Sequence, residues 1–351
     1  MELQAIPSPA PPLHLVEDLD QALDEAAERS EQARTTPEPE LREPELPARR
    51  WVPRELLGMP LVSRLLRFAA EEWLMIAAAW VAIALSPGWA YPFLAFFVAM
   101  RLHALGVLLH DATHMDLRGK EPAVRLLELL VGYPIASTLD AMRYHHLRHH
   151  KDSGMPTDPY MKPSMRGRPW VALLIWLRHL FLVPWWTLRG PFGLAAVVIP
   201  SLRTFYARAF LQDRSGHDLT LHPEVIRCAK EELGQVLFHL SLVCFATIRP
   251  DWVIWYYLIP AWVTGLLAGY RVLREHDYAP TKDRSIRTIL ATTCDHNLTG
   301  VGRFVLAPRN IGYHIVHHLH PRVALENLPR LRDYYVARWP ETYPSAPRTP
   351  R

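Results

Sequence analysis

The chain has 351 residues, of which 50% are hydrophobic, and its formal net charge at pH 7 is +4. Its three cysteines are far apart in the sequence, which argues against a disulfide framework or a cysteine-bound zinc ion. No helix-turn-helix, RNA-binding or zinc-finger pattern accompanies the basic charge, so we do not expect a nucleic acid as partner. The unusual feature is a total of eighteen histidines, half of which lie in three clusters.

The N-terminal segment 1–50 is rich in proline, glutamate and alanine, and it carries twelve acids against five arginines. This composition predicts a disordered tail. The rest of the chain is therefore basic, which suits a protein that faces anionic lipid at a cytoplasmic membrane surface. We expect residues 51–340 to form one membrane domain and residues 341–351 to form a disordered C-terminal tail.

A first membrane hairpin is predicted between residues 68 and 109. No charged residue occurs from Trp73 to Met100, and Pro87 and Gly88 mark a turn within this stretch. The two halves, 68–86 and 89–109, are each close to the ~20 residues that cross a bilayer as a helix. Basic residues flank the outer ends and none lies in the turn, which places both ends in the cytoplasm. The flanking residues are Arg64, Arg67, Arg101, Arg118 and Lys120.

A second hairpin is predicted from the apolar segments 233–248 and 252–270, with its ends again cytoplasmic because Arg271 and Arg274 follow it. Between the hairpins, residues 165–210 are apolar but interrupted by charges and prolines, and we expect them to lie in the membrane interface. The predicted fold is therefore all-α. It is a multi-pass membrane protein with two transmembrane helical hairpins, about four spans, and a cytoplasmic helical cap that holds a pair of metal ions.

Three histidine clusters lie near these segments: HDATH at 110–114, HHLRHH at 145–150 and HIVHH at 314–318. On a helix, positions i, i+3 and i+4 share one face, so each cluster can direct two or three imidazoles at one point. Imidazole suits iron, zinc, copper and nickel, and so many converging rings are too many for one ion. Together with one histidine that follows the last span, the candidate ligands of two metal ions are His110, His114, His146, His149, His150, His276, His314, His317 and His318.

The remaining histidines and the nearby acids have other interpretations. A single histidine beside an apolar segment is usually packed or solvated, and we expect this of His103, His179, His217, His222 and His239. We expect His145 to contact the ligands without binding a metal ion itself, and we do not expect His296 or His320 to be ligands. Acids that accept the second ring N–H of a ligand orient that ligand. The acids in reach are Asp111, Asp140, Asp158, Glu275 and Asp277, each of which can also be a helix cap or a surface charge.

The clusters resemble the three histidine boxes of the integral-membrane fatty acid desaturase family, HxxxH, HxxHH and HxxHH, in the same order. The run NIGYHIVHHLHPRVALENLP is similar to the family's stretch after its last span, and Glu275-His276 occupies the place of an additional histidine ligand. The resemblance covers residues 60–335 and implies two iron ions (Fe2+), O2 as co-substrate, and electrons from a ferredoxin or cytochrome b5. No HPGG signature of cytochrome b5 occurs, so we expect the donor to be a separate protein.

The function that this resemblance implies is the O2-dependent introduction of a double bond into a lipid acyl chain, with the active site on the cytoplasmic side. The third box contains Ile315 and Val316 where family members often carry an acid, which leaves the substrate open. The alternative is a hydroxylase or ketolase that acts on a lipid or another apolar molecule with the same iron site. A zinc-dependent membrane hydrolase or a metal transporter fits less well, because HExxH is absent and the first hairpin carries no charge within its spans.

Overall fold

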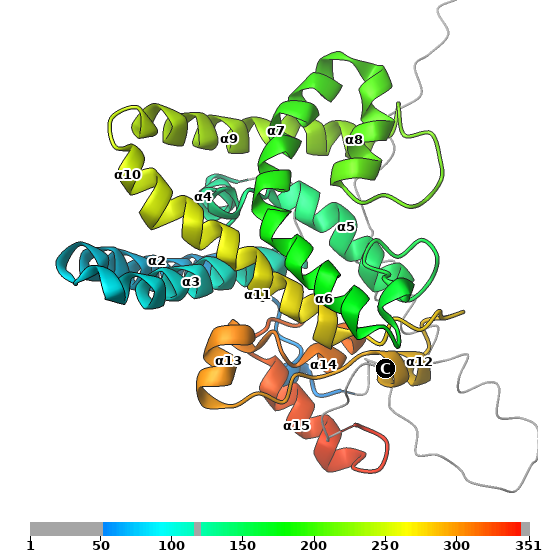
Figure 1. The fold of residues 1–351 in the computed structure, drawn as a ribbon. Coiled ribbons are helices and arrows are strands. Elements are labelled where there is room, and N and C mark those ends of the chain that lie inside the picture. Colours follow the sequence, from blue (N-terminus) through cyan, green and yellow to red (C-terminus); the bar gives the residue numbers. More distant parts are fainter. Residues whose placement is uncertain (1–51, 116–120, 345–351) are drawn as a thin grey trace, which may run out of the picture.

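The computed structural model describes residues 52–115 and 121–344. The predicted N-terminal tail and residues 345–351 of the predicted C-terminal tail lie outside this part of the chain. The all-α prediction is confirmed, because the elements of the described residues are helices and no strand occurs among them (Figure 1). Tyr343, near the end of the described part, is buried, and its hydroxyl donates to Asp295 Oδ2 at 2.8 Å.

The first predicted hairpin is present. Helices α2 (Val62–Leu85) and α3 (Tyr91–Ala112) are joined by the 3-10 turn η3 (Gly88–Ala90) and pack against each other. Most of the second half of α3 is buried, whereas α2 exposes apolar side chains such as Val81. The segments Val62–Leu85 and Gly88–Ala112 are both long and apolar enough to cross a membrane.

The second hairpin consists of α9 (Pro223–Ala246) and a long segment built from α10 (Pro250–Trp252), the π-helix η8 (Val253–Leu258) and α11 (Ile259–Glu275). Helix α11 packs on α3, and the Thr264 hydroxyl donates to the Ala99 carbonyl oxygen at 3.0 Å. The Trp80 indole N–H donates to the Tyr256 carbonyl oxygen at 2.9 Å. The turns of both hairpins lie on the same side of the molecule, at the left of Figure 1.

Four candidate membrane spans occur in the described residues, which is the predicted number, but one of them is not where we expected it. Only the part of α9 after Glu232 is apolar, because its first half carries three acids and two bases, and α9 is not among the four. The apolar part is shorter than the ~20 residues that a span needs.

The other candidate span is Pro169–Val198, which comprises α6 (Pro169–Arg178), η6 (His179–Phe181) and α7 (Leu182–Val198). These helices expose large apolar side chains, among them Trp170 and Leu174. In Figure 1, α7 crosses α9, and α6 and η6 pack beside α11. The interfacial position of residues 165–210 stays a prediction.

A buried ion pair fastens α7 to α9. Arg189 Nε donates to Glu232 Oε1 at 2.6 Å, and the Tyr206 hydroxyl donates to the same oxygen at 2.9 Å. Arg189 Nη2 also donates to Gln235 Oε1 at 3.0 Å and to the Ala136 carbonyl oxygen at 3.2 Å. Because Ala136 shortly precedes α5 (Leu139–Asp152), this network fixes the start of the helix that carries the second histidine cluster.

Shorter helices complete the molecule, and α12 to α15 lie together below the hairpins in Figure 1. The shorter helices are η2 (Arg54–Leu56), α4 (Pro122–Val131), η4 (Tyr133–Ile135), η5 (Pro163–Met165), η7 (Pro200–Leu202), α8 (Arg203–Phe210), α12 (Ile286–Thr292), α13 (Gly300–Leu306), η9 (Pro308–Asn310), α14 (His314–Leu319) and α15 (Leu328–Arg338).

Candidate metal centre

The second histidine cluster lies on α5, and the start of this helix is capped. Thr138 Oγ1 accepts a hydrogen bond from the Ala141 N–H at 3.2 Å, which is the usual role of a threonine before a helix. Buried Glu128 accepts from the Leu139 N–H at 2.7 Å. These bonds set the position of the helix, so its four histidines all lie in the interior.

The first cluster lies at the end of α3, which stops at Ala112. The chain then tightens, because the Thr113 N–H donates to the His110 carbonyl oxygen at 3.1 Å and the His114 N–H donates to the Asp111 carbonyl oxygen at 3.2 Å. This extra turn places the His114 ring centroid 5.6 Å from that of His110. Both rings therefore face the same interior space.

The third cluster and the single histidine come from different elements. Helix α14 begins at His314, and its Ile315 N–H donates to buried Asp295 Oδ1 at 2.8 Å. His276 directly follows α11 in extended conformation and forms an isolated antiparallel bridge with Thr293. The bridge ties the end of the last span to the segment that follows α12.

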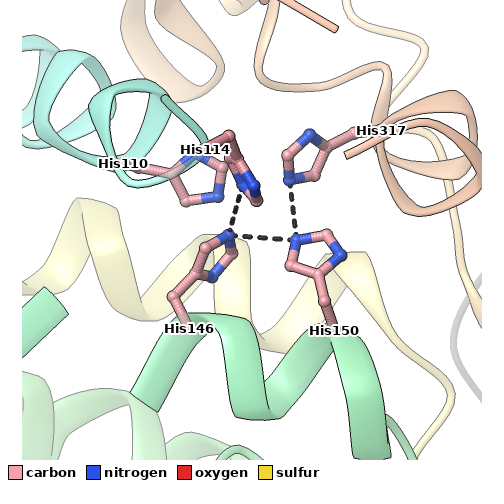
Figure 2. Close-up of side chains that lie close together, drawn as sticks. All are labelled: His110, His114, His146, His150 and His317. Atoms are coloured by element: carbon pink, nitrogen blue, oxygen red, sulfur yellow. Dashed lines mark hydrogen bonds between the residues drawn. The ribbon is translucent and has the colours of Figure 1, made fainter. Parts of the chain in front are cut away.

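Five of the nine candidate ligands form a first group (Figure 2). Each offers one nitrogen, and these nitrogens lie within 4.8 Å of one another. The Nε2 atoms of His114 and His146 are 2.9 Å apart, those of His146 and His150 are 3.0 Å apart, and those of His150 and His317 are 3.0 Å apart. The His110 ring lies 4.0 Å from the His146 ring, between centroids.

The other four candidate ligands form a second group, in which one nitrogen of each ring lies within 4.8 Å of the others. The Nε2 atoms of His149 and His276 are 3.0 Å apart, those of His276 and His314 are 3.0 Å apart, and those of His314 and His318 are 3.1 Å apart. The two groups are neighbours, since the ring of His318 stacks on that of His150 with centroids 4.3 Å apart.

Both groups draw on α5 and on α14, which corrects the expectation that each cluster points at one position. Successive residues of a helix differ by about 100° in direction, so residues four apart share a face more closely than residues three apart. On α5 the pair four apart, His146 and His150, joins the first group and His149 joins the second. On α14 the assignment is the opposite. The pair four apart, His314 and His318, joins the second group, and His317 joins the first.

Burial keeps most of these imidazoles neutral. Removal from water lowers the pKa of His276 and of His317 to about 3. It also lowers the pKa well below 6.5 for His114, His146, His150, His314 and His318. A neutral imidazole has a lone pair free for a metal ion. Both ring nitrogens of His110 are buried without a hydrogen-bond partner among the described residues, and a metal ion is the partner that the surrounding nitrogens suit.

One of the predicted acids orients a candidate ligand directly. Asp158 Oδ1 accepts from His149 Nδ1 at 2.8 Å, while the Gly154 and Tyr160 N–H groups each donate to the same carboxylate at 2.8 Å. Burial alone would raise the pKa of Asp158, but His149 and these hydrogen bonds outweigh it and lower the pKa to about 2. With its Nδ1 held in this way, His149 presents Nε2 to the second group.

A second acid lies at the edge of the second group. Glu275 Oε2 is 3.7 Å from His314 Nε2, the same nitrogen that faces the other three rings. Glu275 Oε1 accepts from Arg271 Nε at 2.6 Å and lies 3.2 Å from His296 Nε2. His296 is thus connected to the candidate ligands through Glu275.

A family model described as fatty acid desaturase matches residues 87–348. The chain is a member of the fatty acid desaturase family. A search of curated proteins finds no match. The match covers most of the chain and includes all three histidine clusters, so membership of the desaturase family and the four apolar helices together indicate a lipid-modifying membrane oxidoreductase.

The other predicted residues of this desaturase-family chain have different partners. Asp111 Oδ1 accepts from the Leu325 N–H at 3.4 Å. Two further acids form ion pairs with arginines, Asp140 with Arg227 at 3.1 Å and Asp277 with Arg166 at 3.2 Å. Among the histidines expected to be packed or solvated, His103 is buried and His217 is exposed, while three others bond locally or are half-buried: His179, His222 and His239. His320 Nε2 lies 2.8 Å from the Tyr335 hydroxyl.

Two further residues beside the candidate ligands were not predicted. The Tyr160 ring stacks on His149 with centroids 4.4 Å apart, and its hydroxyl lies 2.7 Å from His145 Nδ1. His145 therefore touches the site through this tyrosine. Arg284 Nη2 lies 3.0 Å from His318 Nδ1, and burial lowers the pKa of this arginine to about 10. Neither residue belongs to a spaced pattern, so the sequence offers nothing that would single them out in this family member.

Proposed function

We propose that the chain is an O2-dependent di-iron oxidoreductase that introduces a double bond into a lipid acyl chain. The observation that supports this proposal is the pair of adjacent, buried histidine groups at the ends of helices long enough to span a membrane. We propose as iron ligands His110, His114, His146, His150 and His317 of the first group and His149, His276, His314 and His318 of the second.

The reaction explains why two redox-active ions are needed. Removing one hydrogen from each of two neighbouring carbons, with two electrons and two protons from outside, reduces O2 to two water molecules. Iron supplies the activation of O2, which is chemistry that side chains alone do not perform. Zinc has no redox chemistry. The electrons are proposed to come from a separate ferredoxin or cytochrome b5 type protein.

The protein's own residues position the ligands and exclude water. Asp158 fixes the proton of His149 on Nδ1, which leaves Nε2 free for a metal ion. Glu275 is held by Arg271 beside the second group, and His145 supports His149 through Tyr160. The other predicted acids bond to neighbouring segments and fix them in place. These acids are Asp111, Asp140 and Asp277.

We place the active site on the cytoplasmic side of the membrane. The histidine groups lie at the ends of α3 and α11, and the turns of both hairpins lie away from them. Arg64 and Arg67 precede the apolar part of α2, and Arg274 lies in the last turn of α11, whereas the turn of the first hairpin has no basic residue. Basic residues next to spans are typical of the cytoplasmic side.

The proposal is tested by expressing the full chain in a host with a simple fatty acid profile and analysing its lipids by mass spectrometry. A desaturase product has lost two hydrogens, whereas a hydroxylase or ketolase product has gained oxygen. His317→Ala should abolish the product, and His217→Ala, which changes an exposed histidine, should not. Metal analysis separates the remaining alternatives, because two irons per chain support the oxidase and one zinc per chain supports a hydrolase.

A further inference from the structure

A pocket of about 370 Å³ opens where the first hairpin meets α13. Its walls come from α2, α3, α13 and η9, and the residues that matter here are Glu72, Met75, Arg101, Arg303, Phe304 and Arg309. We call it the α13 pocket. It is separate from the histidine groups, since none of the nine candidate ligands lines it.

The α13 pocket lies at the boundary of the apolar part of the hairpin. Glu72 and Arg101 line it, and they are the charged residues that end the charge-free stretch from 73 to 100 on either side. Apolar side chains that line it or follow its lining residues in sequence are exposed, because Phe304 of the lining is 41% exposed and Val301, next to Gly300 of the lining, is 79% exposed. A pocket with charges on one side and exposed apolar groups on the other has the character of a membrane–water interface.

Two of the three arginines in the pocket are already neutralised. Arg101 Nη1 donates to Glu72 Oε2 at 3.1 Å, and both side chains are buried. Arg309 Nε donates to Glu72 Oε1 at 2.8 Å, and its Nη1 donates to Glu71 Oε2 at 2.9 Å. This network connects η9 to α2 and α3, so it holds one wall of the pocket in place.

The third arginine has no such partner. Arg303 Nε donates to the Leu298 carbonyl oxygen at 3.3 Å, and the guanidinium lies 5.4 Å from the centre of the Tyr313 ring. Within residues 52–115 and 121–344, no carboxylate pairs with Arg303. It is half-buried and also lines a neighbouring pocket of about 170 Å³, together with Asn310 and Arg332. A partly desolvated guanidinium with free donors is a good partner for a phosphate group.

We propose that the α13 pocket binds the acyl chains of an anionic phospholipid, with the phosphate on Arg303 where this pocket and its neighbour meet. Glu71 and Glu72 balance the charges of Arg101 and Arg309, so the charge of Arg303 remains and favours an anion. The proposed cytoplasmic orientation would expose the pocket to the leaflet in which anionic lipids are concentrated. The bound lipid would hold α13 against the first hairpin, without taking part in the reaction at the histidine groups.

The test measures binding of dioctanoyl phosphatidylglycerol to the purified full chain in detergent. We expect it to bind more tightly than dioctanoyl phosphatidylcholine and to raise the thermal unfolding temperature. Arg303→Gln should weaken this binding by roughly tenfold, the effect of losing a charged hydrogen bond. Arg303→Lys should retain most of it. Arg330→Gln is the matched control, because it removes an exposed arginine of α15 and should leave binding unchanged.

Met75→Trp provides a second variant that keeps every charge and fills the pocket from α2, and it should also weaken lipid binding. Equal affinity of Arg303→Gln and the native chain for phosphatidylglycerol would overturn the proposal. So would equal affinity of the native chain for both lipids, or the same stabilisation by inorganic phosphate alone. Iron content is measured on the same samples, so a failure of the lipid site is distinguished from a failure of the metal centre.

Discussion

Replacing Asp158 by asparagine is expected to weaken one of the two candidate metal sites and to spare the other. The carboxylate contacts only one of the nine candidate ligands, His149, which belongs to the second group. Asparagine has nearly the same size, so the change removes charge and one acceptor without opening a cavity. Its effect on metal binding must therefore pass through the orientation of the His149 ring.

The structure gives the size of this effect. The pKa of Asp158 is lowered from 3.8 to about 2, which corresponds to about 2.5 kcal/mol of preference for the ionised carboxylate in this environment. The asparagine side chain would also turn its amide group toward the Gly154 N–H, and a buried donor left without an acceptor costs about 1–3 kcal/mol. Mutation of such a partner of a metal-bound histidine typically lowers metal affinity by about 10–100-fold.

The assay is a chelator titration of the iron-loaded protein, with the iron that remains measured by mass spectrometry. Asp158→Asn should lose one iron per chain at a chelator concentration at which the native protein keeps both. Asp140→Asn is the matched control, because Asp140 pairs with Arg227 of α9 and should leave both irons in place. If Asp158→Asn holds both irons as tightly as the native chain does, the argument that this carboxylate orients His149 is refuted.

Three further predictions concern stability. Arg189→Leu leaves Glu232 buried without its partner and should lower the free energy of unfolding by about 3–5 kcal/mol, whereas replacing both residues by leucine should recover most of the loss in thermal denaturation. Gly265→Ala places a methyl group against the backbone of η6 and should lower the free energy of unfolding by about 1–3 kcal/mol. Gly88→Ala should leave it unchanged, because the added methyl group has no neighbour within 4 Å. The pKa of His317 is about 3 in the fold against 6.5 ordinarily, so the unfolded chain takes up the proton first. Stability and bound iron should be constant above pH 6.5 and fall as the pH is lowered from there towards 3, and iron retention that does not change over this range would contradict the shift.

The sequence predicts the members of the histidine groups but not how they are divided. Spacings of three and four residues show that imidazoles share a helix face, and that much is local geometry. The division into five and four depends on how α5 and α14 are rotated relative to each other. That rotation is set by contacts distant in sequence, such as the bond between Asp295 and the Ile315 N–H, so no local pattern contains it.

The same limit applies to the supporting residues and to one span. Asp158 reaches His149 because the chain after α5 folds back in a turn closed by the Gly154 N–H, and a count along the sequence does not show this. Residues 233–248 are apolar, but in the structure most of them continue α9, whose first half is charged up to Glu232, so the apolar part of this helix is too short to be a candidate span. The first hairpin was predictable, since its apolar stretch and its turn are both local features.

The most direct test of the proposed metal centre is the number of irons in the purified chain after loading with Fe2+ without oxygen. Plasma mass spectrometry should give two irons per native chain. Alanine at His317, from the first group, and alanine at His276, from the second, should each leave one. A native chain that binds a single ion, or a variant of either group that keeps both irons, would contradict the assignment of the histidines to two metal sites.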